Sequence, residues 1–238
     1  LTAAFFAMEV ISVGVIYYVG LIPCIGSALV AYKLSTFFGA KPEIFHIADY
    51  VPKLNVISVA QVALLAGLCA LVSIVFCLVM KYTHFKLKVT FTNAYIRALV
   101  GGCAIILLTL IIGNQDYNGA GSHIIAAAIE QGDAHWYSFI LKIGFTAITI
   151  GAGYKGGEIV PSFFIGATFG CFAGSVLGLD AGFSAALGLV ALFCGVVNCP
   201  LASLILSVEV FGTQGLLLFA VSCGVSYMLS GYLGLYAS

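Results

Sequence analysis

Charged residues are scarce in this chain. Asp, Glu, Lys and Arg make up only 8% of its 238 residues, whereas 62% are hydrophobic and the mean hydropathy is +1.16. A soluble domain of this length cannot bury so much apolar surface. The apolar runs are long and lack the strict alternation of membrane β-strands, so the composition predicts an all-α integral membrane protein.

The chain also lacks net charge and any recognisable metal or redox motif. Nine basic residues balance nine acidic ones, which gives no indication of a nucleic-acid partner. None of the eight cysteines stands in a CxxC pair or at zinc-ligand spacing, so we expect small buried thiols, with no disulfide, metal or cofactor. They are Cys24, Cys69, Cys77, Cys103, Cys171, Cys194, Cys199 and Cys223.

The apolar segments differ in length, and the later ones are short. We expect the end of a helix at 1–10, a run at 11–39 broken by Pro23, and helices at 56–80, 98–113, 136–150, 160–178, 184–197, 200–211 and 214–231. A bilayer core of about 30 Å needs roughly 20 helical residues, so several of these helices must be re-entrant or broken. Such backbone is tolerated only inside protein or around a cavity.

The few charges suggest an orientation. Lys81, Lys86, Lys88 and Arg97 cluster in a segment at 81–97, which we expect to be a cytoplasmic loop. The polar segment 114–135 is richer in acids and is expected outside, with a short helix capped by Ser122.

One stretch, Gly151 to Gly170, combines a glycine-rich loop with a helix start. Gly151, Gly153, Gly156 and Gly157 allow positive φ and close approach to a ligand, and Pro161 suits a first helical turn. Gly166 and Gly170 then permit close helix packing.

Glu158 lies inside this stretch, where free N–H groups and the helix dipole favour an anion. A carboxyl fits there if it is protonated, competes with the anion, or alternates between the two. The alternative is a flexible loop with Glu158 as an ordinary acid near the helix start.

A weak internal repeat links the two ends of the chain. Leu1–Val10 and Leu201–Val210 share Leu, Glu and Val at the same offsets, so Glu9 and Glu209 are equivalent acids in apolar helices. We interpret both as structural acids that bind nearby loop amides. Paired repeats with broken helices are typical of secondary transporters.

The chain begins at Leu1 without Met and already inside an apolar segment. We therefore interpret 1–238 as the C-terminal part of a longer transmembrane domain. By analogy with Pro200, a proline is expected before Leu1, with a Gly-x-Glu-Gly segment farther upstream.

Three motifs resemble the CLC family of chloride channels and transporters. They are Gly156-Gly157-Glu158-Ile159-Val160-Pro161 followed by Gly166-Ala167, Asn198-Cys199-Pro200-Leu201 followed by Glu209, and the C-terminal Tyr236. The resemblance covers essentially the whole chain, but only the later part of a CLC subunit. It implies a CLC-like inverted-repeat fold and a homodimer in which each subunit has its own pathway.

Within that family the chain is most similar to the bacterial fluoride/proton antiporters. Glu158 stands where chloride-type members have an apolar residue, Ile159 replaces their Phe, and Val10 replaces the internal glutamate of proton-coupled chloride exchangers. The resemblance implies an anion site at Gly157, Glu158, Ile159 and Tyr236, with Glu158 carrying the proton. It also implies a multi-pass protein in the inner (plasma) membrane of a bacterium, in contact with lipid.

Other functions are also compatible with parts of the sequence. A passive anion channel of the same fold is the nearest alternative, because channel members also have Val at the position of Val10. An intramembrane enzyme using Glu158 with His123 or His135 is disfavoured, since no nucleophile motif is present, and a purely structural subunit would not need the acid. Without the resemblance, Tyr236 would be interpreted as an interfacial aromatic residue.

Overall fold

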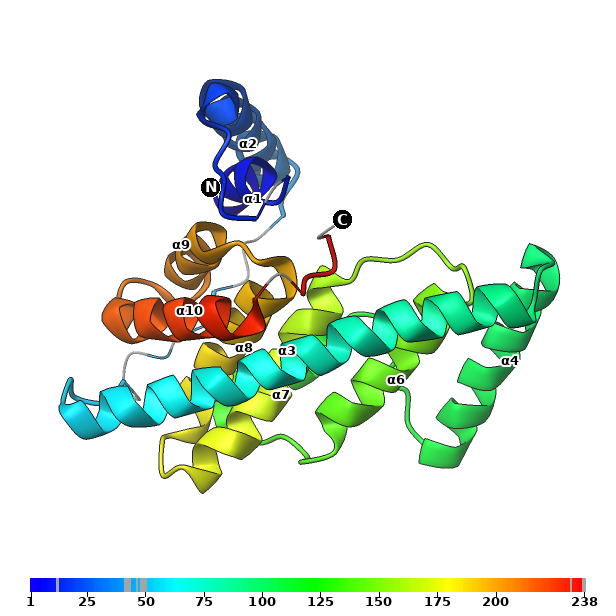
Figure 1. Ribbon diagram of the computed structural model, residues 1–238. Helices are drawn as coiled ribbons and strands as arrows, with labels where there is room; N and C mark the ends of the chain where they lie inside the picture. The colour runs from blue at the N-terminus through cyan, green and yellow to red at the C-terminus, as the bar shows by residue number, and fades with distance from the viewer. Residues whose placement is uncertain (12, 41–43, 46, 48–50, 232, 237–238) are drawn as a thin grey trace.

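The computed structural model describes residues 1–11, 13–40, 44–45, 47, 51–231 and 233–236, and the regular structure of these residues is entirely helical (Figure 1). The elements are α1 (Thr2–Glu9), η1 (Tyr18–Gly20), α2 (Leu21–Phe37), α3 (Val56–Thr90), α4 (Ala94–Ile112), α5 (Ser122–Ala126), η3 (Ala127–Gln131), α6 (Ser138–Gly151), α7 (Ile159–Val176), α8 (Ala181–Val197), α9 (Pro200–Phe211) and α10 (Leu216–Ser230). This confirms the predicted all-α membrane fold.

Local capping explains where three of the helices begin. The side chains of Asn55, Asn93 and Asp180 accept hydrogen bonds from first-turn amides of α3, α4 and α8, at 2.7, 2.9 and 2.9 Å. Each bond satisfies one of the N–H groups that a helix start leaves without an intrahelical partner.

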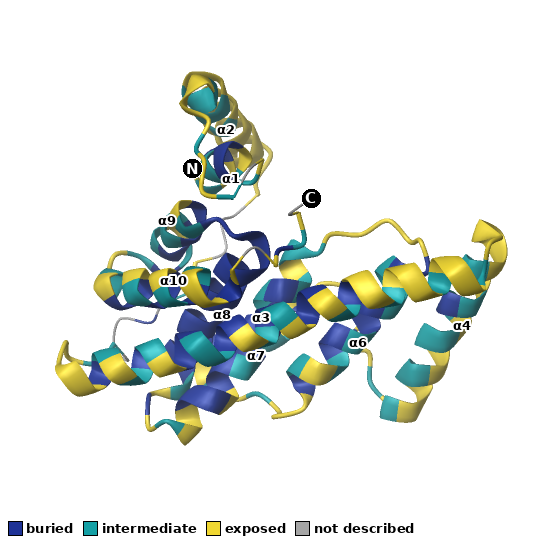
Figure 2. Ribbon diagram, viewed as in Figure 1, coloured by how far each residue is buried: buried dark blue, intermediate teal, exposed yellow. Residues whose placement is uncertain are grey.

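The core is the pair formed by α7 and α8. Every residue of α8 after the first is buried, and in Figure 2 the two helices lie behind α3 as the most deeply buried part of the molecule. Gly166 and Gly170 of α7 face Gly188 of α8, where a Cβ on Gly166 would lie 2.5 Å from the Gly188 carbonyl oxygen. The predicted role of these glycines in close helix packing is therefore confirmed.

Helices α1 and α9 cap one another. The Glu9 carboxylate, at the end of α1, accepts hydrogen bonds from the amides of Leu201 and Ala202 at 3.2 and 2.9 Å. Glu209 near the end of α9 accepts from the amide and hydroxyl of Thr2 at 3.1 and 2.6 Å. The two segments matched in sequence thus lie antiparallel, and both acids have the structural role expected of them.

Among the residues that the structure describes, four helical segments are long and apolar enough to cross a membrane: 18–37, Val56–Thr90, Ala94–Ile112 and Ile159–Val176. The other apolar helices, α6, α8, α9 and α10, have 12 to 17 residues. At 1.5 Å per residue they extend about 18 to 26 Å, too short to cross alone, as predicted. Six of the eight cysteines are buried, as small apolar residues would be.

The basic segment 81–97 is not a loop, contrary to expectation. Helix α3 continues to Thr90, and only residues 91–93 separate it from α4. The reason is that 81–90 contains no Gly or Pro and Lys is a good helix former, so exposed charge lengthens the helix beyond its apolar part.

Two smaller expectations about helix starts are also corrected. Pro23 is the third residue of α2 and does not break the helix, because a proline is tolerated in the first turn. Ser122 is the first residue of α5, and its side chain caps no helix amide. The N-cap residue is Gly121, with φ of 71°, and α5 continues into the π-helical segment η3.

The close packing of α7 against α8 can be tested by adding a methyl group at the contact. Gly166→Ala should destabilise the protein by about 1–3 kcal/mol, because the added methyl group has no space against α8. Gly144→Ala in α6 is the matched control, since a Cβ there meets nothing within 4 Å. Thermal unfolding in detergent measures both, and equal midpoints for the two variants would contradict the packing argument.

Candidate functional site

The glycine-rich loop at 152–158 joins α6 to α7 and is held against the start of α4. The Arg97 Nε donates a hydrogen bond to the Ala152 carbonyl at 3.2 Å, and the Tyr154 hydroxyl donates to the Ala98 carbonyl at 2.9 Å. Gly153 has φ of 99° and passes close to the Arg97 guanidinium. The two bonds fix the beginning of the loop and leave its second half, residues 155–157, exposed.

The loop glycines do not all serve the purpose expected of them. Of the four, only Gly153 has positive φ. Gly151 is the last residue of α6, where a Cβ would lie 3.0 Å from Thr83 and 3.2 Å from Leu87 of α3. Gly156 and Gly157 have open space around them instead. At these two positions the absence of a side chain leaves space beside the backbone and is not needed for a turn.

Glu158 is the N-cap residue of α7 and is half-buried. Its side chain does not cap the helix, so the first amides of α7, beginning with that of Ile159, are left without a side-chain acceptor at this end. Pro161 lies in the first turn as predicted. Burial raises the pKa of the Glu158 carboxyl, and the electrostatic interaction with His84 on α3 opposes that rise.

Tyr236 reaches this neighbourhood from the segment that follows α10. The amide of Leu235 donates a hydrogen bond to the Val196 carbonyl at 3.0 Å, which attaches the segment to the end of α8. Burial, and after it the Glu158 carboxylate, raises the pKa of the Tyr236 phenol. The two groups are therefore close enough to interact electrostatically, although they are 78 residues apart in the chain.

A series of aromatic contacts supports Tyr236. Its ring meets Phe6 of α1 edge to face, with centroids 6.1 Å apart. Phe6 in turn contacts Phe193 of α8 at 6.1 Å, and Phe193 contacts Phe163 of α7 at 5.1 Å. The position of the tyrosine thus depends on three helices, including α7, which begins directly after Glu158.

The other candidate residues lie elsewhere. His123 pairs with Asp116 at 3.2 Å, and His135 stacks on Tyr137, in a small pocket that Glu158 does not line. Within the described ranges, no group of three or more His, Cys, Asp or Glu side chains is arranged to hold a metal ion.

Lys142 is a functional candidate that was not predicted from the sequence, although the sequence contains a signal for it. It is the only charged residue of the apolar helix α6, and its side chain is buried beside a cavity that Gly156 and Gly157 also line. A lone charge in a membrane helix marks a functional candidate.

Comparisons with known proteins identify relatives along the whole chain. A family model described as voltage gated chloride channel matches residues 1–231. A chloride/fluoride channel protein from Pseudomonas syringae pv. tomato is 31% identical over 242 residues, which cover 99% of this chain and 53% of the relative. An uncharacterized protein from Methanocaldococcus jannaschii is 27% identical over 240 residues, covering 98% and 58%. The chain thus spans just over half the length of these relatives.

Solved structures agree with the sequence relatives. The crystal structure of a CLC-type fluoride/proton antiporter superposes with a TM-score of 0.92 at 27% identity, covering 99% of this chain and 59% of that one. A eukaryotic CLC transporter gives 0.65 at 19% identity, covering 94% and 40%, and supports the fold alone.

The hydrogen bond between Tyr154 and Ala98 should limit opening of the loop. Tyr154→Phe removes one bond worth about 0.5–1.5 kcal/mol, so amide exchange at 152–158 should accelerate roughly two- to ten-fold. Tyr95→Phe is the control, because that side chain is 87% exposed at the start of α4. Hydrogen–deuterium exchange measures both, and unchanged protection in Tyr154→Phe would show that the bond does not hold the loop.

Proposed function

The chain belongs to the CLC, or voltage gated chloride channel, family, and from that premise we propose that it is part of a secondary transporter that exports fluoride in exchange for protons. The observation that carries the proposal is the position of Glu158, a titratable acid at the uncapped start of α7 that interacts with Tyr236. The structural likeness to a fluoride/proton antiporter supports the same exchange.

The chemistry of this helix start suits a small anion. In the proposed site, the backbone around Gly157 and the amide of Ile159 supply uncharged donors, and Tyr236 supplies a hydroxyl. Neutral Glu158 would add an O–H donor, and a hydrogen bond from it to fluoride is charge-assisted and short. Ionised Glu158 would instead repel the anion from the same amides.

This alternation is the basis of coupling. When Glu158 is protonated the site accepts fluoride, and when the carboxyl is ionised it competes for the same helix N-terminus. The raised pKa of Glu158 keeps the neutral form populated at a higher pH than for an exposed glutamate. One residue therefore links the proton to the anion.

We place the assembled protein in the inner membrane of a bacterium, as a homodimer surrounded by lipid. Support comes from the bacterial origin of the 31% identical relative and from the apolar surface of α2, which has no buried residue. Ile22, Val30 and Phe37 are among its exposed large side chains. An exposed face of this kind requires an apolar environment, lipid or protein.

A passive anion channel is the second candidate, and two observations favour it. The Pseudomonas relative is named a channel, and Val10, at the end of α1, leaves no second acid after Glu9. Reversal potentials in a planar bilayer under a proton gradient distinguish the two. An antiporter's reversal potential moves with the pH difference, whereas a channel's follows the anion gradient alone.

Glu158→Gln should separate fluoride movement from proton movement. The amide cannot release a proton, so proton flux driven by a fluoride gradient should fall at least ten-fold in reconstituted vesicles. A pH-sensitive dye records the proton flux, and a fluoride electrode records the anion.

Glu130→Gln is the matched control, because Glu130 is an exposed acid outside the site. It should retain coupled exchange. Coupled exchange at the wild-type ratio in Glu158→Gln would rule out Glu158 as the proton carrier.

Selectivity is the second test. We expect fluoride efflux at least ten-fold above chloride efflux, because hydrogen-bond strength at an O–H donor rises with the basicity of the anion. Ten-fold requires only about 1.4 kcal/mol of differential binding, which one charge-assisted hydrogen bond supplies. Equal efflux of the two halides, measured with ion-selective electrodes, would contradict fluoride selectivity and would indicate a general anion transporter.

A further inference from the structure

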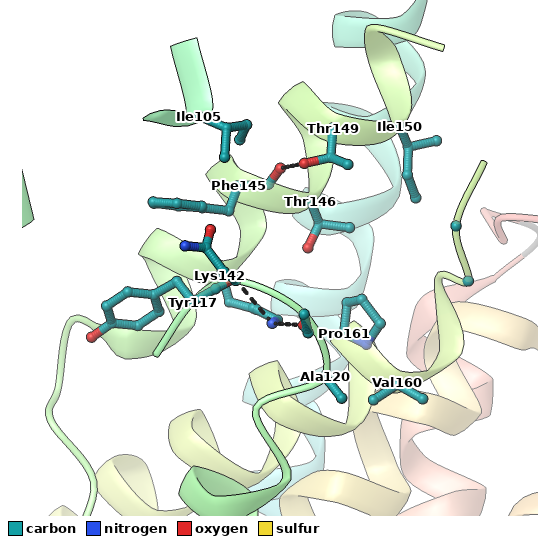
Figure 3. Close-up of a pocket in the computed structure, with 14 residues that line it drawn as sticks. Ile105, Tyr117, Ala120, Lys142, Phe145, Thr146, Thr149, Ile150, Val160 and Pro161 are labelled. Atoms are coloured by element: carbon teal, nitrogen blue, oxygen red, sulfur yellow. Dashed lines mark hydrogen bonds between the residues drawn. The ribbon is translucent and has the colours of Figure 1, made fainter. Parts of the chain in front are cut away.

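A cavity of about 460 Å³ lies beside the glycine-rich loop, between α6, α4 and the start of α7 (Figure 3). Lys142 and Thr146 of α6 line one side, and Gly156 and Gly157 line another. Glu158 and Tyr236 are not among its lining residues. The cavity therefore borders the proposed transport site, with which it shares Gly157, but does not include Glu158 or Tyr236.

Among the described residues that line this cavity, Lys142 alone carries a charge, and it is 1% exposed. Its Nζ donates hydrogen bonds to the carbonyl oxygens of Gly119 and Tyr117 at 2.7 and 3.2 Å and lies 4.8 Å from the centroid of the Phe164 ring. All three partners are uncharged. Among the residues that the structure describes, no carboxylate forms an ion pair with Lys142.

An isolated positive charge in such a place is costly. Carbonyl dipoles and an aromatic face offset part of the desolvation of the charged ammonium, and no acidic side chain among the lining residues neutralises it. The interaction of a small anion with that charge is strengthened by the low dielectric and weakened little by salt. The cavity is therefore electropositive and has room for an anion with part of its hydration shell.

We propose that this cavity is a second anion-binding site, which takes a small inorganic anion such as a halide with the Lys142 ammonium as its counter-charge. The Thr146 hydroxyl points toward the Lys142 end of the cavity (Figure 3) and can donate to the same ion. Gly156 and Gly157, which have open space around them, allow the ion to approach the loop backbone. The site holds an anion next to the start of α7, whether or not Glu158 carries a proton.

The competing role for Lys142 is a brace for the segment 117–120. A brace explains the two hydrogen bonds, but it predicts the same stability at every halide concentration. An anion site predicts that the ion stabilises the folded protein by an amount that grows with concentration. The two roles therefore differ in a measurement that does not depend on transport.

The experiment uses full-length protein in detergent, with sodium bromide and sodium fluoride as probes and sodium gluconate to hold ionic strength constant. Crystals soaked in bromide should show an anomalous peak within hydrogen-bond distance of Lys142 Nζ. Lys142→Met should lose that peak, one equivalent of halide by calorimetry, and the halide-dependent rise in melting temperature. Lys142→Arg should keep all three.

Two further variants isolate the site. Lys155→Met removes an exposed lysine of the same loop and should leave the peak in place. Glu158→Gln should also retain it, so a failure of the proton-coupling proposal would not remove this site.

Three results would overturn the proposal: no bromide in the wild-type cavity, unchanged halide stoichiometry in Lys142→Met, or a stability loss in that variant that is the same at all halide concentrations. If Lys142→Met does not fold, the bromide maps of the wild type and of Lys142→Arg decide the question. An empty cavity in both would contradict the site.

Discussion

The requirement that dominates this structure is that free amides at helix starts find acceptors in an apolar environment. In three helices the acceptor is a neighbouring side chain, from Asn55, Asn93 or Asp180. In α1 and α9 the acceptor comes from the other copy of the internal repeat: Glu9 accepts from the first amides of α9, and Glu209 from the first amide of α1. Water cannot supply these bonds inside a bilayer, so a carboxylate is the strongest acceptor that the chain can provide.

The reciprocal caps also determine the geometry around Tyr236. Because Glu9 holds the end of α1 against the start of α9, Phe6 is placed between Phe193 of α8 and the Tyr236 ring. Tyr236 lies in a short segment with little regular structure of its own. Its position is therefore supplied by a cap and two aromatic contacts made by residues near the opposite end of the chain.

Much of this architecture could be predicted from local signals. The bounds of α9 follow from Pro200 at its start and Gly212 after its end, and the structural role of Glu9 follows from the cost of an isolated acid. The length of α3 could not be predicted from hydropathy, because its last turns are basic and exposed. Lys142 has a sequence signal, a lone charge in an apolar helix, but its carbonyl partners come from a distant segment that only the fold identifies.

Gly156 and Gly157 show how the two proposed sites are related. Neither has positive φ, and a Cβ on either would meet no atom of the described residues, so neither turn geometry nor internal packing requires glycine there. Close approach of another group to the backbone is the remaining reason for glycine at such positions. Both glycines line the Lys142 cavity, and Glu158 follows Gly157 directly in the chain. Under the two proposals, an exposed backbone without side chains would let an anion approach both the Lys142 ammonium and the helix start at Glu158.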